Sequence, residues 1–170
     1  MEITRHFTAT TIIVFKKKVL LHMHKKLGIW LPVGGHINRD ELPEEAAIRE
    51  VKEESGLTVE LFNPDQEINF EDAKQLMRPM HIILENINQF HQHIDFIYYA
   101  EANTSELNPA EGEVKDLRWL TEDEIKALGK IPANVKKTSL EALRIFSGMG
   151  QFYNYMCSET NALGVKKIIC

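Results

Sequence analysis

One segment, running from Gly35 to Leu57 (GHINRDELPEEAAIREVKEESGL), constrains this chain more than any other. Pro43 suits the first turn of a helix and Gly56 suits the position just past its end, so the sequence predicts a helix over residues 43–55. Three glutamates of this helix stand at i, i+3 and i+4, and they therefore lie within about 100° of one another on its surface. They are Glu50, Glu53 and Glu54.

This acidic cluster needs a positive partner, because three like charges in one patch repel one another. Hard divalent cations such as Mg²⁺ prefer carboxylate and water oxygens, and they bridge to substrate phosphates. A metal site is therefore one interpretation of the cluster. The other is a solvated acidic face, since E-x-x-E-E patterns are common on surface helices.

The remaining positions of the helix suggest how it packs. Ala46 and Ala47 lie one turn earlier on the side of the glutamates, where small side chains would leave room for a metal and a ligand. Ile48 and Val51 point elsewhere, and we expect them to anchor the helix to a sheet.

The whole segment resembles the Nudix box, a pattern of Gly, five residues, Glu, seven residues and then Arg-Glu-apolar-x-Glu-Glu-x-Gly-apolar. Every specified position matches, from Gly35 and Glu41 to the run 49–57. Seven fixed residues at about 6% each give roughly one chance match in 10⁸ windows. The lead-in Trp30-Leu31-Pro32 is also similar to that of the family, and the resemblance extends over residues 5 to 130.

The resemblance implies an α/β protein with the Nudix fold, an α/β/α sandwich around a mixed β-sheet. Residues 1–130 would form the Nudix hydrolase domain, and residues 131–170 a C-terminal helical extension packed on the same domain. Residue patterns agree with mixed strands and helices. They predict strands over 7–15, 19–23, 30–35, 57–61, 81–84, 94–101 and 117–120, a loop with a short helix in 63–77, a helix capped by Thr121 and a helix over 139–156.

The resemblance also implies a hydrolase that cleaves a diphosphate linkage in a nucleoside diphosphate-linked substrate, with Mg²⁺ or Mn²⁺ as cofactor. By position, Glu50, Glu53 and Glu54 would be the metal ligands, and Arg49 would orient a box glutamate. One of these glutamates, or a carboxylate of a later loop, would activate the attacking water.

Four further residues receive roles from the same resemblance. Gly35 and Gly56 would be turn glycines, where a Cβ is not tolerated, and Glu41 would brace the loop or assist the site. Glu113 precedes the strand predicted over 117–120, where Nudix enzymes often place another catalytic or metal-binding glutamate. Loop glutamates are usually only solvated, which is the alternative for Glu113.

Three polar residues alternate at and just before the start of the strand predicted over 94–101, so on a strand they would share one face. His91, His93 and Asp95 would all point the same way. The two histidines are candidates for substrate or metal binding. The alternative is that they are ordinary residues of a strand, either solvent-exposed or packed and hydrogen-bonded. Tyr98 and Tyr99 are expected in the core rather than stacked on a base.

Composition narrows the class of partner. With 170 residues and 44% hydrophobic side chains, the chain suits one compact domain. A net charge of −5 argues against duplex nucleic acid, whereas a small nucleotide-like substrate can be neutralised by a metal. Without a signal-like or membrane-length apolar run, and with only two late cysteines, we expect a cytoplasmic protein. The oligomeric state stays open, a homodimer included.

Two other functions on the same fold compete with the hydrolase. A catalytically silent nucleotide-binding or sensor module would be expected to lose box glutamates, and none is lost here. An isopentenyl diphosphate isomerase would need a catalytic cysteine before the box, and no cysteine precedes Cys157. The substrate stays open among ADP-ribose, oxidised nucleoside triphosphates, nucleotide sugars, dinucleoside polyphosphates and RNA 5′ ends.

Overall fold

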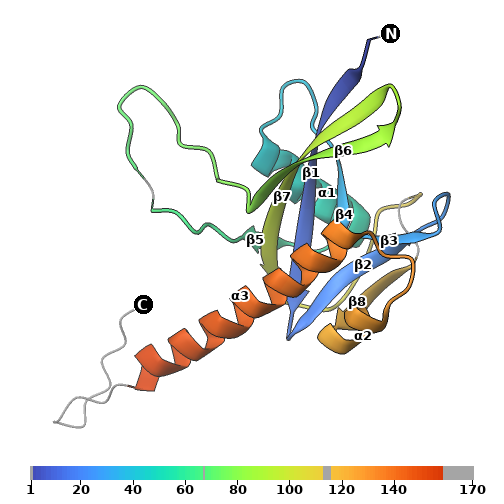
Figure 1. Ribbon diagram of the computed structural model, residues 1–170. Helices are drawn as coiled ribbons and strands as arrows, with labels where there is room; N and C mark the ends of the chain where they lie inside the picture. The colour runs from blue at the N-terminus through green and yellow to red at the C-terminus, as the bar shows by residue number, and fades with distance from the viewer. Residues whose placement is uncertain (1, 67, 113–115, 159–170) are drawn as a thin grey trace.

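A single mixed β-sheet organises the molecule. The computed structural model describes residues 2–66, 68–112 and 116–158, with residues 149–158 as backbone only (Figure 1). Its eight strands are β1 (Thr4–Phe15), β2 (Lys18–His24), β3 (Ile29–Leu31), β4 (Val33–His36), β5 (Val59–Leu61), β6 (His81–Asn88), β7 (His91–Ala102) and β8 (Leu117–Thr121).

The two longest strands form the centre of the sheet. β1 and β7 run parallel, with the register Thr4 opposite His91 through Val14 opposite Glu101. β1 also pairs antiparallel with β4 near its start and with β2 at its end, while β7 pairs antiparallel with β6 and β5. Both central strands are rich in β-branched and aromatic residues, which suit a pleated surface covered on both sides.

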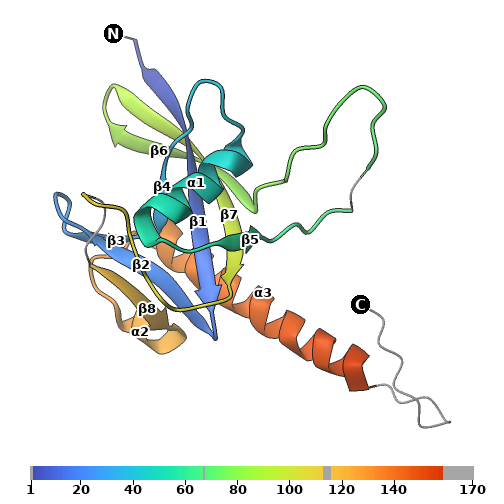
Figure 2. The same ribbon diagram turned by 180° about the vertical axis from the view of Figure 1, so that it is seen from behind.

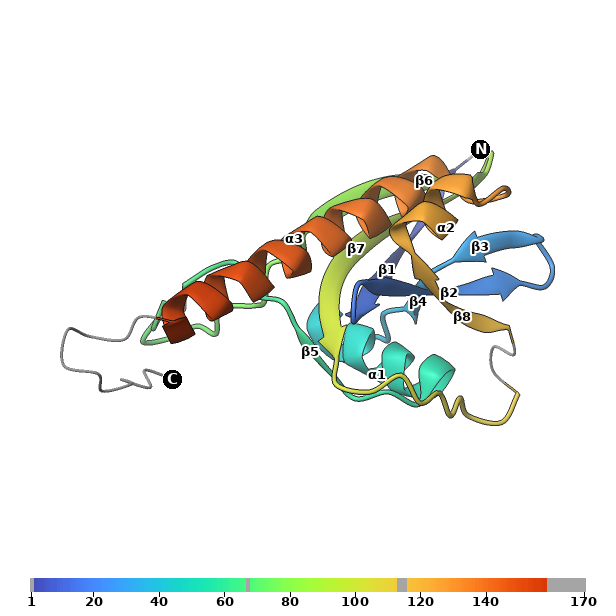
Figure 3. The same cartoon turned by 90° about the horizontal axis from the view of Figure 1, so that it is seen from below.

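Helices cover both faces of this sheet. Figures 2 and 3 show α1 (Pro43–Ser55) on one face, and α2 (Glu122–Ala127) with α3 (Ala133–Ser158) on the other. This is the α/β/α sandwich around a mixed sheet that the sequence predicts. Although α3 is long, no helix within the described ranges is apolar enough over a sufficient length to cross a membrane.

Alternation along β1 divides the core into two layers. Ile12 and Val14 point toward α3 and pack in one cluster with Leu143. Ala9 and Ile13 point the other way, into the two clusters that α1 covers. Since successive strand side chains face opposite sides, burial of both sets requires a helix layer on each face.

Two predicted elements of the N-terminal half differ from the structure. The strand predicted over 30–35 is split into β3 and β4 at Pro32, which cannot donate a backbone hydrogen bond to a strand ladder. The short helix predicted within 63–77 is wrong, because the described residues between β5 and β6 contain no helix. Most side chains of that segment are exposed, so a helix there would have no packed face to stabilise it.

The last helix begins earlier than the periodicity of its apolar residues suggests. α3 starts at Ala133 rather than at residue 139, directly after Pro132, whose carbonyl accepts a hydrogen bond from Lys136 N at 2.9 Å. The first turn holds few large apolar residues, which is why the hydrophobic pattern does not reveal it. Val135, Ala142 and Leu143 bury this part of α3 against the sheet.

Gly56 ends α1 in a left-handed conformation, and we expect Gly56→Ala to destabilise the fold by more than about 2 kcal/mol. Its φ is 76° and its N–H donates to Lys52 O at 3.0 Å, while an added Cβ would collide with the backbone carbonyl of Asn108. Gly28 is a matched control, with φ of 63° and open space around a Cβ. Urea unfolding should show that Gly28→Ala lowers the free energy of unfolding by only about 1 kcal/mol. Equal losses for the two variants would refute the steric argument.

Candidate active site

The box glutamates reach the glycine strand because β4 and α1 pack against each other. Glu54 Oε2 accepts a hydrogen bond from Gly34 N at 2.9 Å. A Cβ built on Gly35 would run into the carboxylate of Glu50. The absence of a side chain at this glycine therefore leaves the space in which the Glu50 carboxylate lies beside the backbone of β4.

Arg49 is the hub of the acidic cluster. Its Nε and Nη2 donate to the two oxygens of Glu41 at 2.7 and 2.9 Å, which is a bidentate ion pair. Its Nη1 donates to Glu50 Oε1 at 2.7 Å and to Glu53 Oε2 at 3.0 Å, and Nη2 also reaches the carbonyl of His36 at 3.0 Å. One guanidinium therefore orients the carboxylates of Glu41, Glu50 and Glu53, and its charge offsets the repulsion among these three.

The electrostatics of this network follow from its geometry. Hydrogen bonds from Arg49 hold the pKa of the Glu41 carboxyl below its usual value, and a contact with the backbone of Asn38 acts in the same direction. The same bonds raise the pKa of Arg49, so its charge is permanent. The guanidinium is thus a fixed cation beside the box glutamates.

The carboxylates present fit a hard divalent cation. Mg²⁺ and Mn²⁺ prefer oxygen ligands, and Glu50, Glu53 and Glu54 supply only oxygens. Each carboxylate has about four lone-pair positions, so one hydrogen bond to Arg49 or Gly34 does not exhaust its capacity to bind a metal. The space left by the missing side chain of Gly35 holds the Glu50 carboxylate in place.

A cavity of about 390 Å³ lies next to the box on the α3 side of the sheet. Gly34, Gly35 and Glu54 form part of its wall, so the cavity and the acidic cluster share a border. The other polar groups come mainly from the central strands and α3. They include Thr8, Thr10, His22, Glu85, His93, Asp95 and Asn134.

Asp95 is the most buried acid of this cavity, with 4% of its surface exposed. Thr8 Oγ1 and Thr10 Oγ1 donate to Asp95 Oδ1 at 2.8 and 3.0 Å. Burial raises the pKa of Asp95, and the two hydroxyls oppose that shift. Burial also raises the pKa of Glu85, and the nearby charge of Asp95 raises it further by a smaller amount. The cavity therefore offers a ligand two carboxyl groups with raised pKa values beside the hydroxyls of Thr8 and Thr10.

The predicted site residues divide into three groups. Arg49, Glu41 and the three box glutamates lie together. Gly56 ends α1 as a turn glycine, whereas Gly35 lies within β4 beside the Glu50 carboxylate rather than in a turn. Glu113 lies outside the described residues. His91 and His93 belong to a different cluster, together with His6 and His36.

The predicted packing of α1 is corrected at three positions. Ala46 and Ala47 are fully buried against Tyr98 and the sheet, so they do not open space for a metal. Their small size instead lets α1 approach the sheet closely. Val51 anchors the helix as predicted, but Ile48 is 46% exposed and does not. The 3.6-residue period groups positions on faces without saying which face meets the sheet.

His6 and His36 are not among the functional residues predicted from the sequence. Both become neighbours of His91 and His93 only through the strand register, since His6 lies opposite His93 and Thr8 lies opposite His36. In the sequence, only the i, i+2 spacing of His91 and His93 indicated that histidines share one face of a strand. The pKa of His93 is lowered mainly by burial. The neighbouring histidines lower it further, in the order His36, His91 and His6.

Glu41 gives a pH-dependent prediction. Its pKa in the folded chain lies below its usual value of 4.5, so the carboxylate contributes stability above about pH 4.5 that is lost as the pH falls through the lower folded pKa. Glu41→Gln should therefore be less stable than the wild type at neutral pH and lose less stability on acidification. Urea unfolding at a series of pH values tests this, and parallel curves for the two proteins would contradict it.

Known proteins resemble this chain in sequence and in overall fold. The NUDIX domain model matches residues 5–141, and the chain belongs to the Nudix family. A NUDIX family hydrolase from Clostridium perfringens is similar over 85% of this chain and 99% of its own, with 43% identity and a TM-score of 0.76. Membership of this family implies a hydrolase that acts on pyrophosphate bonds.

More distant structures share the fold alone. A MutT NUDIX hydrolase from Burkholderia pseudomallei is 20% identical over 82% of this chain and 98% of its own, with a TM-score of 0.61. The NUDIX domain of Shewanella oneidensis NrtR, solved with ADP ribose, is 16% identical over 85% of this chain and 89% of its own, also with a TM-score of 0.61.

Proposed function

We propose that this chain cleaves a diphosphate linkage in a small nucleoside diphosphate-linked substrate by attack of water, with Mg²⁺ or Mn²⁺ held by Glu50, Glu53 and Glu54. The observation that carries the proposal is the complete carboxylate set beside a cavity, with Glu50 and Glu53 oriented by Arg49 and Glu54 bonded by Gly34 N. A catalytically silent module would have no need to keep all of these groups aligned.

The chemistry divides between the cofactor and the chain. When bound, a divalent ion neutralises charge on the phosphoryl oxygens and lowers the pKa of water. Arg49 holds the carboxylates of Glu50 and Glu53 in fixed directions, so no reorganisation is needed during the reaction. A box carboxylate then accepts the proton of the attacking water, with Glu113 as the alternative base.

The cavity is the proposed place for the nucleoside part of the substrate. Its hydroxyl, carboxyl and amide groups can bond a base or sugar, while Glu54 on its border faces the phosphates. His93 also lines the cavity, in keeping with a substrate-binding role for His91 and His93. The ADP ribose bound by the NrtR domain is one nucleotide-like ligand of this class. We further propose that the protein acts in the cytoplasm on such small molecules.

A substrate panel tests the proposal. Nucleoside triphosphates, ADP-ribose, nucleotide sugars and dinucleoside polyphosphates are incubated with the protein and Mg²⁺ or Mn²⁺, and the released nucleotides and phosphates are identified. We expect cleavage of one class, abolished by a chelator and restored by added metal. Nucleotide binding without cleavage of any compound would favour the sensor alternative and overturn the proposal.

Gly35→Ala should reduce kcat by about 10²-fold or more, because a misplacement of about 1 Å is enough to cost that much. The new Cβ would displace the Glu50 carboxylate, while the backbone at Gly35 needs no left-handed conformation. Gly129→Ala is the control, since a Cβ there meets nothing within 4 Å. Steady-state kinetics on the substrate found in the panel measure the effect. Full activity of Gly35→Ala would show that the position of Glu50 is unimportant.

A further inference from the structure

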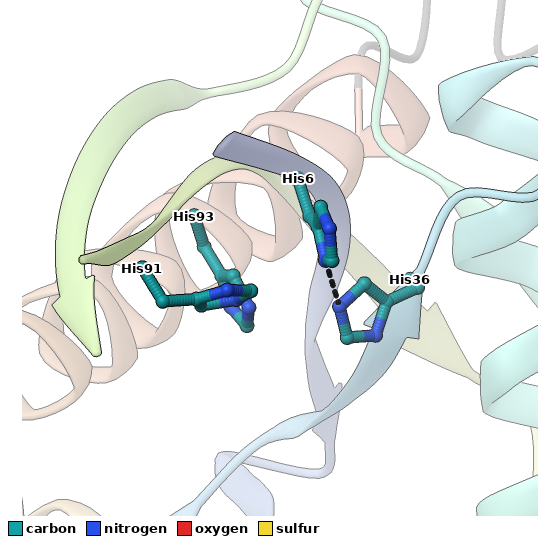
Figure 4. Close-up of side chains that lie close together, drawn as sticks. All are labelled: His6, His36, His91 and His93. Atoms are coloured by element: carbon teal, nitrogen blue, oxygen red, sulfur yellow. Dashed lines mark hydrogen bonds between the residues drawn. The ribbon is translucent and has the colours of Figure 1, made fainter. Parts of the chain in front are cut away.

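Four histidines from three strands converge at the border of the cavity, apart from the carboxylates of the box. Figure 4 shows the side chains of His6, His36, His91 and His93 directed toward one another. One ring nitrogen from each lies within 4.8 Å of those of the other three. From this arrangement we propose that they form a second metal site, one that binds a borderline transition ion such as Zn²⁺.

The strand register builds this cluster. In the parallel β1–β7 ladder, His6 lies opposite His93 and Thr4 lies opposite His91, so the two histidines of β7 flank His6 on one face. The β1–β4 ladder brings the end of β4, with His36, alongside Thr8. Three hydrogen-bonded strands therefore fix the backbone positions of all four ligands, which lowers the entropic cost of assembling a site.

The separations suit tetrahedral coordination. Zn–N bonds of 2.0–2.1 Å at tetrahedral angles place neighbouring ligand nitrogens about 3.3–3.4 Å apart. His6 Nδ1 and His36 Nε2 are 3.3 Å apart. The other pairs lie within 4.8 Å of one another, so rotations of the imidazole side chains have to close them by up to about 1.5 Å. Several rings meet edge-on rather than face-on, as in the pairs His6–His91 and His36–His93.

Ligand chemistry separates this site from the box. Imidazole nitrogens suit Zn²⁺, Cu²⁺ and Ni²⁺, whereas Mg²⁺ and Ca²⁺ are held by oxygens. His6 and His36 are exposed and the two β7 histidines are half-buried, so an ion can enter from solvent. His36 and His93 also line the cavity that Glu54 borders. A cation held by the histidines would therefore face the ligand cavity.

Cobalt binding tests the proposal without any assay of activity. Co²⁺ is titrated into the metal-free full-length chain, in a Cys157→Ser, Cys170→Ser background that removes competing thiolates and with excess Mg²⁺ to occupy the carboxylates. We expect one equivalent to produce the visible absorption bands of tetrahedral Co²⁺, and one equivalent of Zn²⁺ to abolish them. No such bands in this protein would overturn the proposal.

Matched variants assign the ion to its ligands. His91→Gln and His93→Gln, each first shown by circular dichroism to be folded, should weaken Co²⁺ binding by at least tenfold. His81→Gln, whose side chain instead bonds Tyr99 and Glu141, and Glu53→Gln should bind as the parent does. Unchanged binding in both β7 variants would overturn the histidine site. Loss of binding in Glu53→Gln would place the ion at the box, which contradicts this inference and leaves the proposed hydrolase intact.

Discussion

Glu53→Gln or Glu54→Gln should lower the turnover of the diphosphate substrate by several orders of magnitude while the protein stays folded. A glutamine keeps the size of the side chain but removes the negative charge that binds a divalent cation and accepts a proton. Glu53 is nearly half exposed, and a glutamine in place of Glu54 keeps a side-chain oxygen that can accept the hydrogen bond from Gly34 N. Steady-state kinetics, with circular dichroism as a check on folding, measure the effect.

Glu60→Gln serves as the matched control for these two variants. Glu60 is an exposed glutamate of β5, outside the acidic cluster, and its substitution should leave kcat unchanged. A folded Glu53→Gln and a folded Glu54→Gln that both retain near wild-type turnover would refute the assigned mechanism, whatever the substrate.

Arg49→Lys should lower kcat by about 10²-fold with little change in KM, although it preserves the positive charge. A lysine cannot form the bidentate bond to Glu41 while also reaching Glu50 and Glu53, since its ammonium is a point charge without the planar fork. The carboxylates would then lose their fixed directions, at a cost typical of misplaced catalytic groups. Kinetics that separate kcat from KM identify this positioning role.

Arg49→Ala should lose more activity and also destabilise the fold by about 2 kcal/mol, because the half-buried Glu41 loses the cation that forms its bidentate ion pair. Arg78→Lys is the control, since the exposed Arg78 pairs only with the loop residue Asp65 in the described hydrogen bonds. Wild-type kcat in Arg49→Lys would mean that charge alone is sufficient at this position.

The box could be predicted from the sequence because its signals are local. A helix start at Pro43, a glycine stop at Gly56 and the i, i+3, i+4 spacing of the glutamates all depend on neighbours within one helix. The role of Arg49 follows from the same short segment, and the structure places its guanidinium among the predicted carboxylates.

The histidine cluster could not be predicted in the same way, because it depends on long-range pairing. His6 and His93 are adjacent only in the parallel β1–β7 register, which no local pattern encodes. The environment of Ala46 likewise depends on which face of α1 meets the sheet. The short helix predicted within 63–77 was wrong for a different reason. Its polar residues are compatible with a helix, but most described side chains of this segment are exposed, so a helix would have no packed face to stabilise it.

The most direct test of the account is to run the reaction in water labelled with heavy oxygen, with Mg²⁺, on the substrate that the panel selects. Mass spectrometry of the products then shows which bond was broken. We predict one labelled oxygen on a phosphate product, formed only with metal and lost in Glu54→Gln. Label on a carbon of the sugar, or cleavage that persists in the presence of chelator, would contradict metal-dependent attack of water on the diphosphate.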